Sequence, residues 1–404
     1  RDRRGAMPWP LSRSEPARRD ASSTKPASLP VPIPASFTFV LSVFCAPSRY
    51  VQGRDASAAL GEQMAHLGLS GPVLIVASRS NAERLSATWE QTLPRSGFDY
   101  RVHVFGGECS QPEIDRAVAV AHEMGARTIV GAGGGKALDT SRAVALETDA
   151  AMVNCPTLAS SDAPCSAISV VYAADGSVER IQFYPRNPDL VLVDTTIVAA
   201  APSRYLVAGM GDALATWFEA RTVIEAHGRN TVGGAVTMSA GALAELCCQT
   251  LFADGPAAIR AVDVGAVTPA LERVVEANTL LSGLGFESGG LALAHAVHNG
   301  LTAVPGTHDR LHGEKVAFGL MVQLVVEGRP DEEINRVRDF CREVGLPTTL
   351  AEVGLPDVSD ATLATIAERT VAPDESSHHE PFEVTAAMIA DGIRAADRAS
   401  RAVA

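Results

Sequence analysis

The 404-residue sequence predicts an N-terminal α/β domain followed by an all-helical domain. Short apolar runs alternate with helical patterns from about residue 57 to 200, which is typical of a parallel sheet built from right-handed β-α-β units. After Pro202 the sequence is rich in Ala and Leu at helical spacing, with almost no strand signal. A cluster of glycines between a strand and a helix indicates that the first domain binds a phosphate-bearing ligand.

Composition and charge exclude several classes of protein. Hydrophobic residues make up 46% of the chain, too many for a disordered or fibrous protein. The formal net charge of −13, from 34 Lys and Arg against 47 Asp and Glu, argues against a nucleic-acid partner. The seven cysteines contain no Cys-x-x-Cys pair, which is typical of free thiols in a reducing cytoplasm. No apolar run reaches the roughly 20 residues of a membrane helix, so no membrane contact is expected.

The first residues are expected to lie outside the folded body. Residues 1–36 are rich in Arg, Ser and Pro, and such a segment predicts a disordered leader because it has little to bury. The apolar run 37–46 resembles the apolar region of a signal peptide, since it follows an Arg-rich start. It begins more than thirty residues into the sequence, however, later than a signal peptide normally allows. We therefore expect a first β-strand there.

Hydrophobic periodicity defines the elements of the α/β domain. A continuous apolar run such as 72–76 predicts a buried strand, and apolar residues three and four apart in 111–125 predict a helix that ends at Gly125. Asp175-Gly176 between two alternating runs predicts a hairpin laid on the sheet. The expected strands are 72–76, 100–105, 128–130, 151–154, 167–173, 180–184 and 190–194, and the expected helices are 58–67, 81–91 and 111–125.

The sequence pattern changes near residue 200, from alternating strands and helices to helices alone, and we place a domain boundary there. The α/β domain is expected to span 37–200 and the helical domain 201–404. No internal repeat is present. The expected helices of the second domain are 211–226, 233–251, 256–282, 291–301, 314–327, 331–344, 358–369 and 384–401.

A glycine-rich loop follows the expected strand 128–130. Gly131-Ala-Gly-Gly-Gly-Lys136 leads directly into a helix, so backbone N–H groups and the helix N-terminus can hold a phosphate. The loop is neither G-x-G-x-x-G nor G-x-x-x-x-G-K-[ST], and a plain tight turn before a helix is the alternative interpretation. Asp139 lies one helical turn after Gly135, where it either faces the ligand or stabilises the first turn.

The next strand ends in a loop dense in Thr, Ser and Asp, from Cys155 to Ser166. Its hydroxyl groups can donate to a pyrophosphate or a nicotinamide amide, and Asp162 is its only acid. Ligands of open α/β sheets bind at the carboxyl ends of the strands, which favours a functional loop. An ordinary polar loop that caps a helix is the alternative.

Four of the ten histidines fall within 18 residues, at His295, His298, His308 and His312. The first two lie one helical turn apart and share a face, and His312 opens another helix. Upstream, Asp212 stands at the head of a very apolar helix, where it can cap that helix or bind a cation. One Asp and two His from three helices would hold a divalent metal with one position open. Histidines satisfied within an apolar core are the alternative.

Together these residues resemble the glycerol dehydrogenases of the iron-containing, metal-dependent polyol dehydrogenase superfamily. The resemblance covers about residues 40–400 and implies a Rossmann-like dinucleotide-binding domain with an all-α metal-binding domain, an architecture like that of dehydroquinate synthase. Its first block, Pro47-Ser-Arg-Tyr-Val-Gln-Gly53, also favours the strand interpretation of 37–46. The other blocks are Gly133-Gly-Gly-Lys136 with Asp139, Pro156-Thr-Leu-Ala-Ser-Ser-Asp-Ala-Pro164, Gly211-Asp-Ala-Leu-Ala-Thr-Trp-Phe-Glu-Ala220, Gly283-Leu-Gly-Phe-Glu-Ser-Gly-Gly290, His295-Ala-Val-His-Asn-Gly-Leu301 and His312-Gly-Glu-Lys-Val-Ala-Phe318.

The resemblance implies the residues of the site. Zinc would be bound by Asp212, His295 and His312, with Fe²⁺ as an alternative because these ligands suit either ion. Asp162 falls where the family has its polyol-binding acid. His298 is not expected to bind the metal, and from the face of His295 it would relay a proton or orient the site. The implied dinucleotide contacts are Gly134, Gly135, Lys136, Asp139, Thr157, Ser160, Ser166, Ile168 and Tyr172.

Two features depart from the family pattern. The family usually ends the strand 72–77 with an acid that binds the adenosine ribose, whereas here Ser78 stands at that position, followed by Arg79. Position 78 is therefore a cofactor contact that leaves NADP as an alternative to NAD. The 36-residue leader has no counterpart in the family.

The implied function is oxidation of glycerol to dihydroxyacetone with NAD(P), by hydride transfer from a metal-bound alkoxide. The implied partners are a small polyol and further copies of the chain in a homo-oligomer. The alternatives on the same fold are an alcohol or amino-cyclitol dehydrogenase and a dehydroquinate synthase-type lyase. A phosphate substrate would need basic groups near the metal, for which Arg310 and Lys315 are the candidates. A non-catalytic, metal-stabilised binding protein is the remote alternative.

Overall fold

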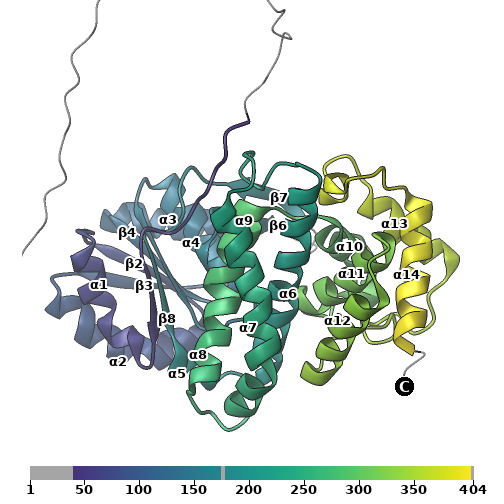
Figure 1. The fold of residues 1–404 in the computed structure, drawn as a ribbon. Helices are drawn as coiled ribbons and strands as arrows, with labels where there is room; N and C mark the ends of the chain where they lie inside the picture. Colours follow the sequence, from purple (N-terminus) through teal and green to yellow (C-terminus); the bar gives the residue numbers. More distant parts are fainter. Residues whose placement is uncertain (1–39, 174–177, 402–404) are drawn as a thin grey trace, which may run out of the picture. The chain divides into compact units, whose positions relative to one another are not determined.

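A six-stranded parallel sheet forms the centre of the first half of the chain (Figure 1). The computed structural model describes residues 40–173 and 178–401. Its strand order is β1-β8-β5-β4-β2-β3 with every pairing parallel, which confirms the predicted α/β architecture. The strands are β1 (Tyr50–Gly53), β2 (Val73–Ala77), β3 (Tyr100–Val104), β4 (Thr128–Gly133), β5 (Ala151–Pro156) and β8 (Leu190–Asp194).

Helices cover both faces of this sheet. Ile75 of β2 belongs to one apolar cluster with Trp89, and the adjacent Leu74 belongs to a second cluster with Ile114. Because alternate residues of the strand face different helical layers, β2 is buried throughout and its sequence is a continuous apolar run. The helices are α1 (Leu60–His66), α2 (Arg79–Arg95), α3 (Gln111–Met124) and α4 (Gly135–Glu147).

The predicted hairpin is present as a separate two-stranded antiparallel sheet of β6 (Ile168–Tyr172) and β7 (Val178–Phe183). It is attached to helix α4, since the Ser169 hydroxyl donates to the Asp139 carbonyl over 3.0 Å. Residues 175–176, the predicted turn, lie outside the described residues. The hairpin therefore extends the α4 layer and does not add strands to the main sheet.

The second half of the chain is helical, as predicted. One apolar core cluster runs from Val191 of β8 through Leu214 and Phe318 to Ile393, so the core of the helical half is continuous with strand β8 of the sheet. Val40–Ala404 form one compact unit, and the boundary near residue 200 stays a prediction. The helices are α5 (Thr195–Ala199), α6 (Ser203–Glu225), α7 (Met238–Val262), α8 (Pro269–Glu276), α9 (Ser282–Gly289), α10 (Leu293–Thr302), α11 (His312–Val326), α12 (Asp331–Val344), α13 (Asp360–Thr370) and α14 (Ala386–Arg401), with a π-helical turn at Ala277–Leu281.

The segment 37–46 differs from the expected first strand. Residues 1–39, and with them the predicted leader, lie outside the described residues. Ser42 makes a single parallel bridge to Ala235, in the loop between α6 and α7. The loop around Ala235 does not continue as an extended strand, so its backbone offers no further hydrogen-bond partners and the pairing stops after one bridge. The first strand of the sheet is instead β1, which pairs with β8.

The predicted helix 256–282 also differs from the structure. Helix α7 continues through Pro256 as far as Val262, and a new helix begins at Pro269. The Thr268 side chain accepts a hydrogen bond from the Leu271 N–H, so Thr268 and Pro269 form the start signal. Pro256 follows the buried Gly255 inside α7 and does not start a helix.

Helices α6 and α11 approach closely at Gly211 and Gly313. A methyl group on Gly211 would collide with the Gly313 carbonyl, and one on Gly313 would collide with the Ala208 carbonyl. Only glycine permits this spacing, which brings the following residue of α6 near the first residue of α11. Among the described residues, every helix is too short or too polar to cross a bilayer.

Candidate metal and cofactor site

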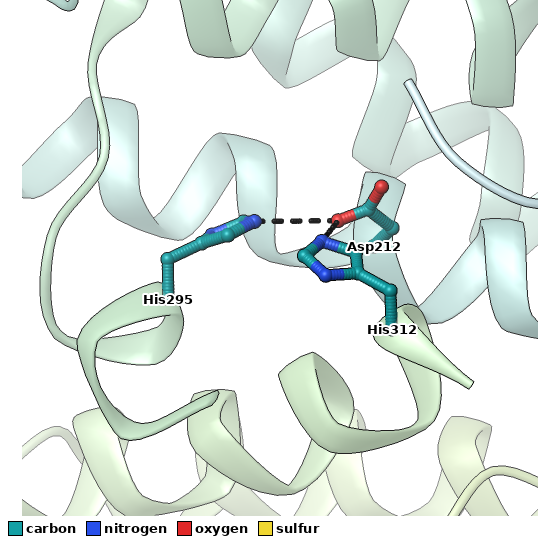
Figure 2. A group of neighbouring side chains, drawn as sticks. All are labelled: Asp212, His295 and His312. Atoms are coloured by element: carbon teal, nitrogen blue, oxygen red, sulfur yellow. Dashed lines mark hydrogen bonds and ion pairs between the residues drawn. The ribbon is translucent and has the colours of Figure 1, made fainter. Parts of the chain in front are cut away.

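Three side chains from three helices converge in the helical half of the chain. Asp212 lies in α6, His295 in α10, and His312 is the first residue of α11. The Asp212 Oδ1 atom lies 3.3 Å from His295 Nε2 and 3.1 Å from His312 Nε2. Figure 2 shows both imidazole rings directed at this carboxylate. The structure thus brings together the three side chains that the sequence nominates as metal ligands.

The donor atoms of this triad fit a divalent metal. One carboxylate oxygen and two imidazole nitrogens lie within 4.8 Å of one another. This donor set suits Zn²⁺ or Fe²⁺. Asp212 is fully buried, whereas the His312 side chain is 41% exposed, so the group is open to solvent on one side. Three protein ligands with an open side are what a catalytic metal requires.

The charges around the triad favour a cation. Burial alone would raise the pKa of Asp212, but the facing His312 and His295 hold it well below its ordinary value. Burial alone would lower the pKa of His295, but Glu219 and Asp212 raise it well above the ordinary value. The shift of Asp212 arises from the two facing imidazoles, and the shift of His295 arises from the two buried carboxylates beside it.

His298 contacts the triad through His312 and not through His295, whose helix face it shares. Its Nε2 atom lies 2.9 Å from His312 Nδ1, and its Nδ1 atom lies 3.0 Å from Asn299 Oδ1. An amide oxygen only accepts, so His298 Nδ1 carries the proton and Nε2 accepts from His312. Burial and the neighbouring His312 and Lys315 lower the pKa of His298 well below its ordinary value, which favours the neutral ring. These contacts support the orienting role, and the proton relay stays a prediction.

Asp162 lies beside the triad. Its backbone N–H donates to Asp212 Oδ2 over 3.1 Å, and its carboxylate Oδ2 accepts from the Ser282 hydroxyl over 3.0 Å. Burial and the charge of Asp212 raise the pKa of Asp162 well above its ordinary value. The predicted substrate acid is therefore within one hydrogen bond of a predicted metal ligand.

The glycine loop lies at the carboxyl end of β4, as predicted. Gly134 precedes the first residue of α4, Gly135, so the loop exposes the N–H groups of a helix N-terminus. The Thr157 N–H donates to the Gly133 carbonyl over 3.0 Å, and its hydroxyl accepts from Asn81 Nδ2 over 3.1 Å. These hydrogen bonds connect the segments that follow three adjacent strands, β2, β4 and β5, at the carboxyl ends of those strands.

Other predicted cofactor contacts surround this edge. Lys136 lies over the Tyr172 ring, 4.9 Å from its centroid, and its ammonium is 2.6 Å from the Glu108 carboxylate. Ser166 receives a 3.1 Å hydrogen bond from the buried guanidinium of Arg142. Ile168 begins β6, next to these groups in the chain. Ser160 lies half-buried in the loop between Thr157 and Asp162.

Asp139 has its carboxylate engaged within the protein. Oδ1 accepts from Arg142 over 2.8 Å, and Oδ2 accepts from the Val170 N–H of the hairpin over 3.3 Å. These contacts tie Asp139 to Arg142 of α4 and to the hairpin, whereas the sequence leaves open a contact with the ligand or a role in the first turn of the helix. A direct contact between Asp139 and the dinucleotide stays a prediction.

Ser78 follows β2 directly and forms the N-cap of α2. Its hydroxyl accepts from the Asn81 N–H over 3.4 Å, and Arg79 beside it is exposed. Position 78 thus lies at the carboxyl ends of the strands, where Ala77 is in register with Ala132 and Ala132 with Cys155, close to Gly134 and Thr157. This is the position from which the end of a second strand reaches a dinucleotide ribose.

Sequence reasoning missed three residues that build the site. Glu219 contacts His295, Ser282 contacts Asp162, and Asn81 contacts Thr157. A signal existed for Glu219, since it stands two helical turns after Asp212 on a very apolar helix and so shares its face. Ser282 and Asn81 carry no comparable signal, because polar residues near helix starts are common.

Two features define the class of this protein. One is the parallel sheet with its glycine loop, and the other is the cluster of a carboxylate and imidazoles in the helical half. Together they are typical of dehydrogenases that use both a dinucleotide and a metal.

Comparison with known proteins gives the family. Residues 47–195 match the model of the iron-containing alcohol dehydrogenases. The glycolaldehyde reductase of Halobacterium salinarum is 48% identical over 362 residues, which cover 90% of this chain and 99% of that protein. The glycerol dehydrogenase of Thermotoga maritima is 49% identical over 358 residues, covering 88% and 96%.

A solved structure agrees with these sequence relatives. The crystal structure of glycerol dehydrogenase from Schizosaccharomyces pombe matches with a TM-score of 0.85 at 38% identity, covering 89% of this chain and 91% of that one. The chain therefore belongs to the iron-containing alcohol dehydrogenase family. It is an oxidoreductase of the metal-dependent polyol dehydrogenase type, and the resemblance to glycerol dehydrogenases is confirmed. No finding favours the lyase, the amino-cyclitol dehydrogenase or the non-catalytic alternative.

Proposed function

We propose that this protein is a zinc-dependent, NAD(P)-linked dehydrogenase that oxidises glycerol to dihydroxyacetone. The observation that carries the proposal is the position of Asp162. Its loop starts at Thr157, bonded to the glycine loop, and reaches Asp162, bonded to the metal-ligand candidate Asp212. A substrate held there lies between the metal site and the dinucleotide edge of the sheet.

The chain's own residues have distinct tasks in this proposal. A divalent metal supplies Lewis-acid polarisation of an alcohol oxygen, and a nicotinamide accepts a hydride. The Asp162 carboxylate orients a second hydroxyl of the substrate by accepting its hydrogen bond. The N–H groups at the start of α4 bind the pyrophosphate. His298 accepts from His312 Nδ1 and so leaves His312 Nε2 as the nitrogen that would bind the metal.

Zinc is the first choice of metal, and iron is the second. One carboxylate and two imidazoles suit both ions, so the choice rests on reconstitution. The metal-free chain is loaded with Zn²⁺ or Fe²⁺ in anaerobic buffer, and the ratio of turnover numbers is measured. Higher turnover with Fe²⁺ would replace zinc in the proposal.

The test of the function is a panel of substrates assayed with NAD and with NADP, before and after chelation. Glycerol, propane-1,2-diol and propan-2-ol are oxidised, and glycolaldehyde and dihydroxyacetone are reduced. We expect the highest kcat/KM for glycerol among the alcohols and loss of activity on chelation. His312→Ala should lose activity while still binding the dinucleotide, because His312 lies outside the sheet. Full turnover by this variant without metal would refute the proposal.

We also propose a reducing, cytoplasmic environment and a homo-oligomeric state. The first is supported by the seven cysteines, which are all free thiols in the structure. The second rests on the family resemblance alone. Sedimentation analysis of the purified chain measures it directly.

A further inference from the structure

Glu219 lies directly behind one of the metal-ligand candidates. Its carboxylate Oε2 is 2.6 Å from His295 Nδ1, and both side chains are buried. Glu219 belongs to α6, two helical turns after Asp212, whereas His295 belongs to α10. One helix therefore supplies both a ligand candidate and the partner of a second ligand candidate.

The remaining oxygen of Glu219 fixes the carboxylate itself. Oε1 accepts the backbone N–H groups of Ala292 and His295, each over 2.9 Å. These are donors at the start of α10, which have no partner within the helix. Both oxygens are thus bonded to the same end of α10, and the carboxylate cannot rotate without losing two backbone hydrogen bonds.

This arrangement decides which ring nitrogen of His295 carries the proton. A fully buried carboxylate that already accepts two N–H groups takes a third donor, so the proton lies on Nδ1. Nε2, which faces Asp212 Oδ1 3.3 Å away, is then the ring nitrogen left for a metal. Only a deprotonated Nε2 can bind a metal at that position.

The other imidazole of the triad has a different partner. His312 is oriented by the neutral ring of His298, which is held in turn by Asn299. A carboxylate raises the basicity of a ligating imidazole more than a neutral acceptor does, because its charge stabilises the ring proton. The two imidazoles therefore differ in donor strength, and His295 is the stronger one.

We propose that Glu219 is a positioning residue of the metal site: it holds His295 as the Nδ1–H tautomer and increases the affinity of the site for a divalent metal. This rests on the proposed function only in that the triad binds a metal. Glu219 touches neither substrate nor cofactor in this role and acts through His295.

The test is metal binding by the full chain without substrate. In Glu219→Gln the amide cannot accept from Nδ1 through its nitrogen, and an NH₂ group there favours the tautomer with its proton on Nε2. We expect Zn²⁺, measured by competition with a chromophoric chelator, to bind about 10- to 100-fold more weakly. The visible absorption bands of the Co²⁺-loaded protein should change in position or intensity. Glu219→Asp, which keeps the charge, should recover part of the affinity.

Glu287→Gln is the matched control. Glu287 is also a fully buried glutamate of the helical half, and it accepts the Ala167 N–H and the Asn187 amide. Its loss perturbs packing to a similar degree without touching the triad, so its Zn²⁺ affinity should stay within twofold of wild type. Dinucleotide binding by each variant shows that the sheet is intact.

Three outcomes would overturn the proposal. These are an unchanged Zn²⁺ affinity and Co²⁺ spectrum in Glu219→Gln, an equal loss in Glu287→Gln, and a wild-type chain that binds no divalent metal. The proposed function fails separately. A wild-type chain that binds Zn²⁺ tightly but oxidises no polyol refutes that function and leaves the role of Glu219 standing.

Discussion

Asp162 and Asp212 are two buried acids, and the backbone N–H of Asp162 donates to the Asp212 carboxylate. The partners of the two side chains separate their roles. Asp212 faces two imidazole nitrogens, which hold its pKa low and favour the ionised carboxylate that a metal ligand needs. Asp162 faces the Ser282 hydroxyl, and burial with the Asp212 charge raises its pKa. A carboxylate with a hydroxyl partner suits recognition of a second hydroxyl, whereas one with imidazole partners suits a metal.

Asp162→Asn tests the recognition of a diol. The variant keeps the shape of the side chain but replaces one acceptor by an NH₂ donor. We expect kcat/KM for glycerol and propane-1,2-diol to fall at least tenfold, about 1.4 kcal/mol or more, and the value for propan-2-ol to fall much less. Steady-state kinetics with the three alcohols measure this. An equal loss for all three would mean that Asp162 acts on the metal site and not on the second hydroxyl.

At the scale of residues, the sequence identifies the metal-ligand candidates better than the residues that orient them. His295 and His312 stand in a dense histidine cluster, and Asp212 is an acid in a very apolar helical segment, so each carries a local signal. The prediction that Asp212 stands at the head of its helix is wrong, because α6 begins at Ser203 and Asp212 lies inside it. Glu219 and His298 acquire their roles from the packing of α6 against α10 and α11. The sequence places His298 beside His295, but the crossing of α10 and α11 brings it to His312. Such contacts depend on how helices cross, which periodicity within one helix does not determine.

At the scale of elements, we expect the junction of β2 and α2 to govern the choice of dinucleotide. Ser78 caps α2 at the edge where Gly134 and Thr157 also lie. A hydroxyl leaves room for a 2′-phosphate, and the exposed guanidinium of Arg79 can bind it. An acid at position 78 would instead bind the ribose hydroxyl and repel the phosphate.

Ser78→Asp should shift the preference toward NAD. Asp is as good an N-cap as Ser, so α2 stays intact and the stability changes little. We expect the ratio of kcat/KM with NADP to that with NAD to fall at least tenfold in the variant. Arg79→Ala should lower the same ratio without affecting the NAD value. A ratio that moves in neither variant would show that this junction does not face the ribose.

The segment that follows α13 carries a buried acid, Glu380, which lies against the helical core. Burial, with the charges of Glu327 and Glu219, raises its pKa to about 9. Its neighbour Glu327 accepts hydrogen bonds from Thr222 and Gln323 and pairs with Arg329. Glu380 is therefore protonated in the folded chain at neutral pH.

This pKa predicts a pH dependence of stability. In the unfolded chain Glu380 titrates near about 4.3, so between this value and about 9 the folded state holds one more proton. The free energy of unfolding then falls as pH rises, by at most about 1.4 kcal/mol per unit for this group. Glu380→Gln, which keeps a donor, should flatten the decline measured by denaturant unfolding from pH 6 to 8. The exposed Glu383→Gln should not, and equal slopes in all three proteins would contradict the assignment.

The elements themselves were predictable where local signals and packing agree. The strands of the sheet follow from runs of apolar residues because both of their faces are buried, as in β2. The apolar run 37–46 has strand-like residues, but its partner near Ala235 is a loop. Pro256 resembles a helix start, yet it stands inside α7, because the start signal at Thr268 and Pro269 lies further along. The π-helical turn at Ala277–Leu281 has no signal in the periodicity.

At the scale of the whole molecule, a metal at the triad would join α6, α10 and α11. A ligand that binds only the folded state stabilises it by about 2.7 kcal/mol at one hundred times its dissociation constant. We expect the midpoint of thermal unfolding to rise by several degrees when Zn²⁺ is added to the metal-free chain, and to fall on chelation. His312→Ala should show no such rise. A shift of the same size in that variant would place the bound metal elsewhere.

The close approach of α6 and α11 has a consequence for which ions the protein can use. Gly211 and Gly313 precede Asp212 and follow His312, and their missing methyl groups set the distance between the two helices. Metal–ligand bonds tolerate changes of only about 0.2 Å, far less than the displacement that an added methyl group forces. The two glycines would therefore limit the size of the ion that Asp212 and His312 can bind together. Neither glycine carries a ligand atom of its own.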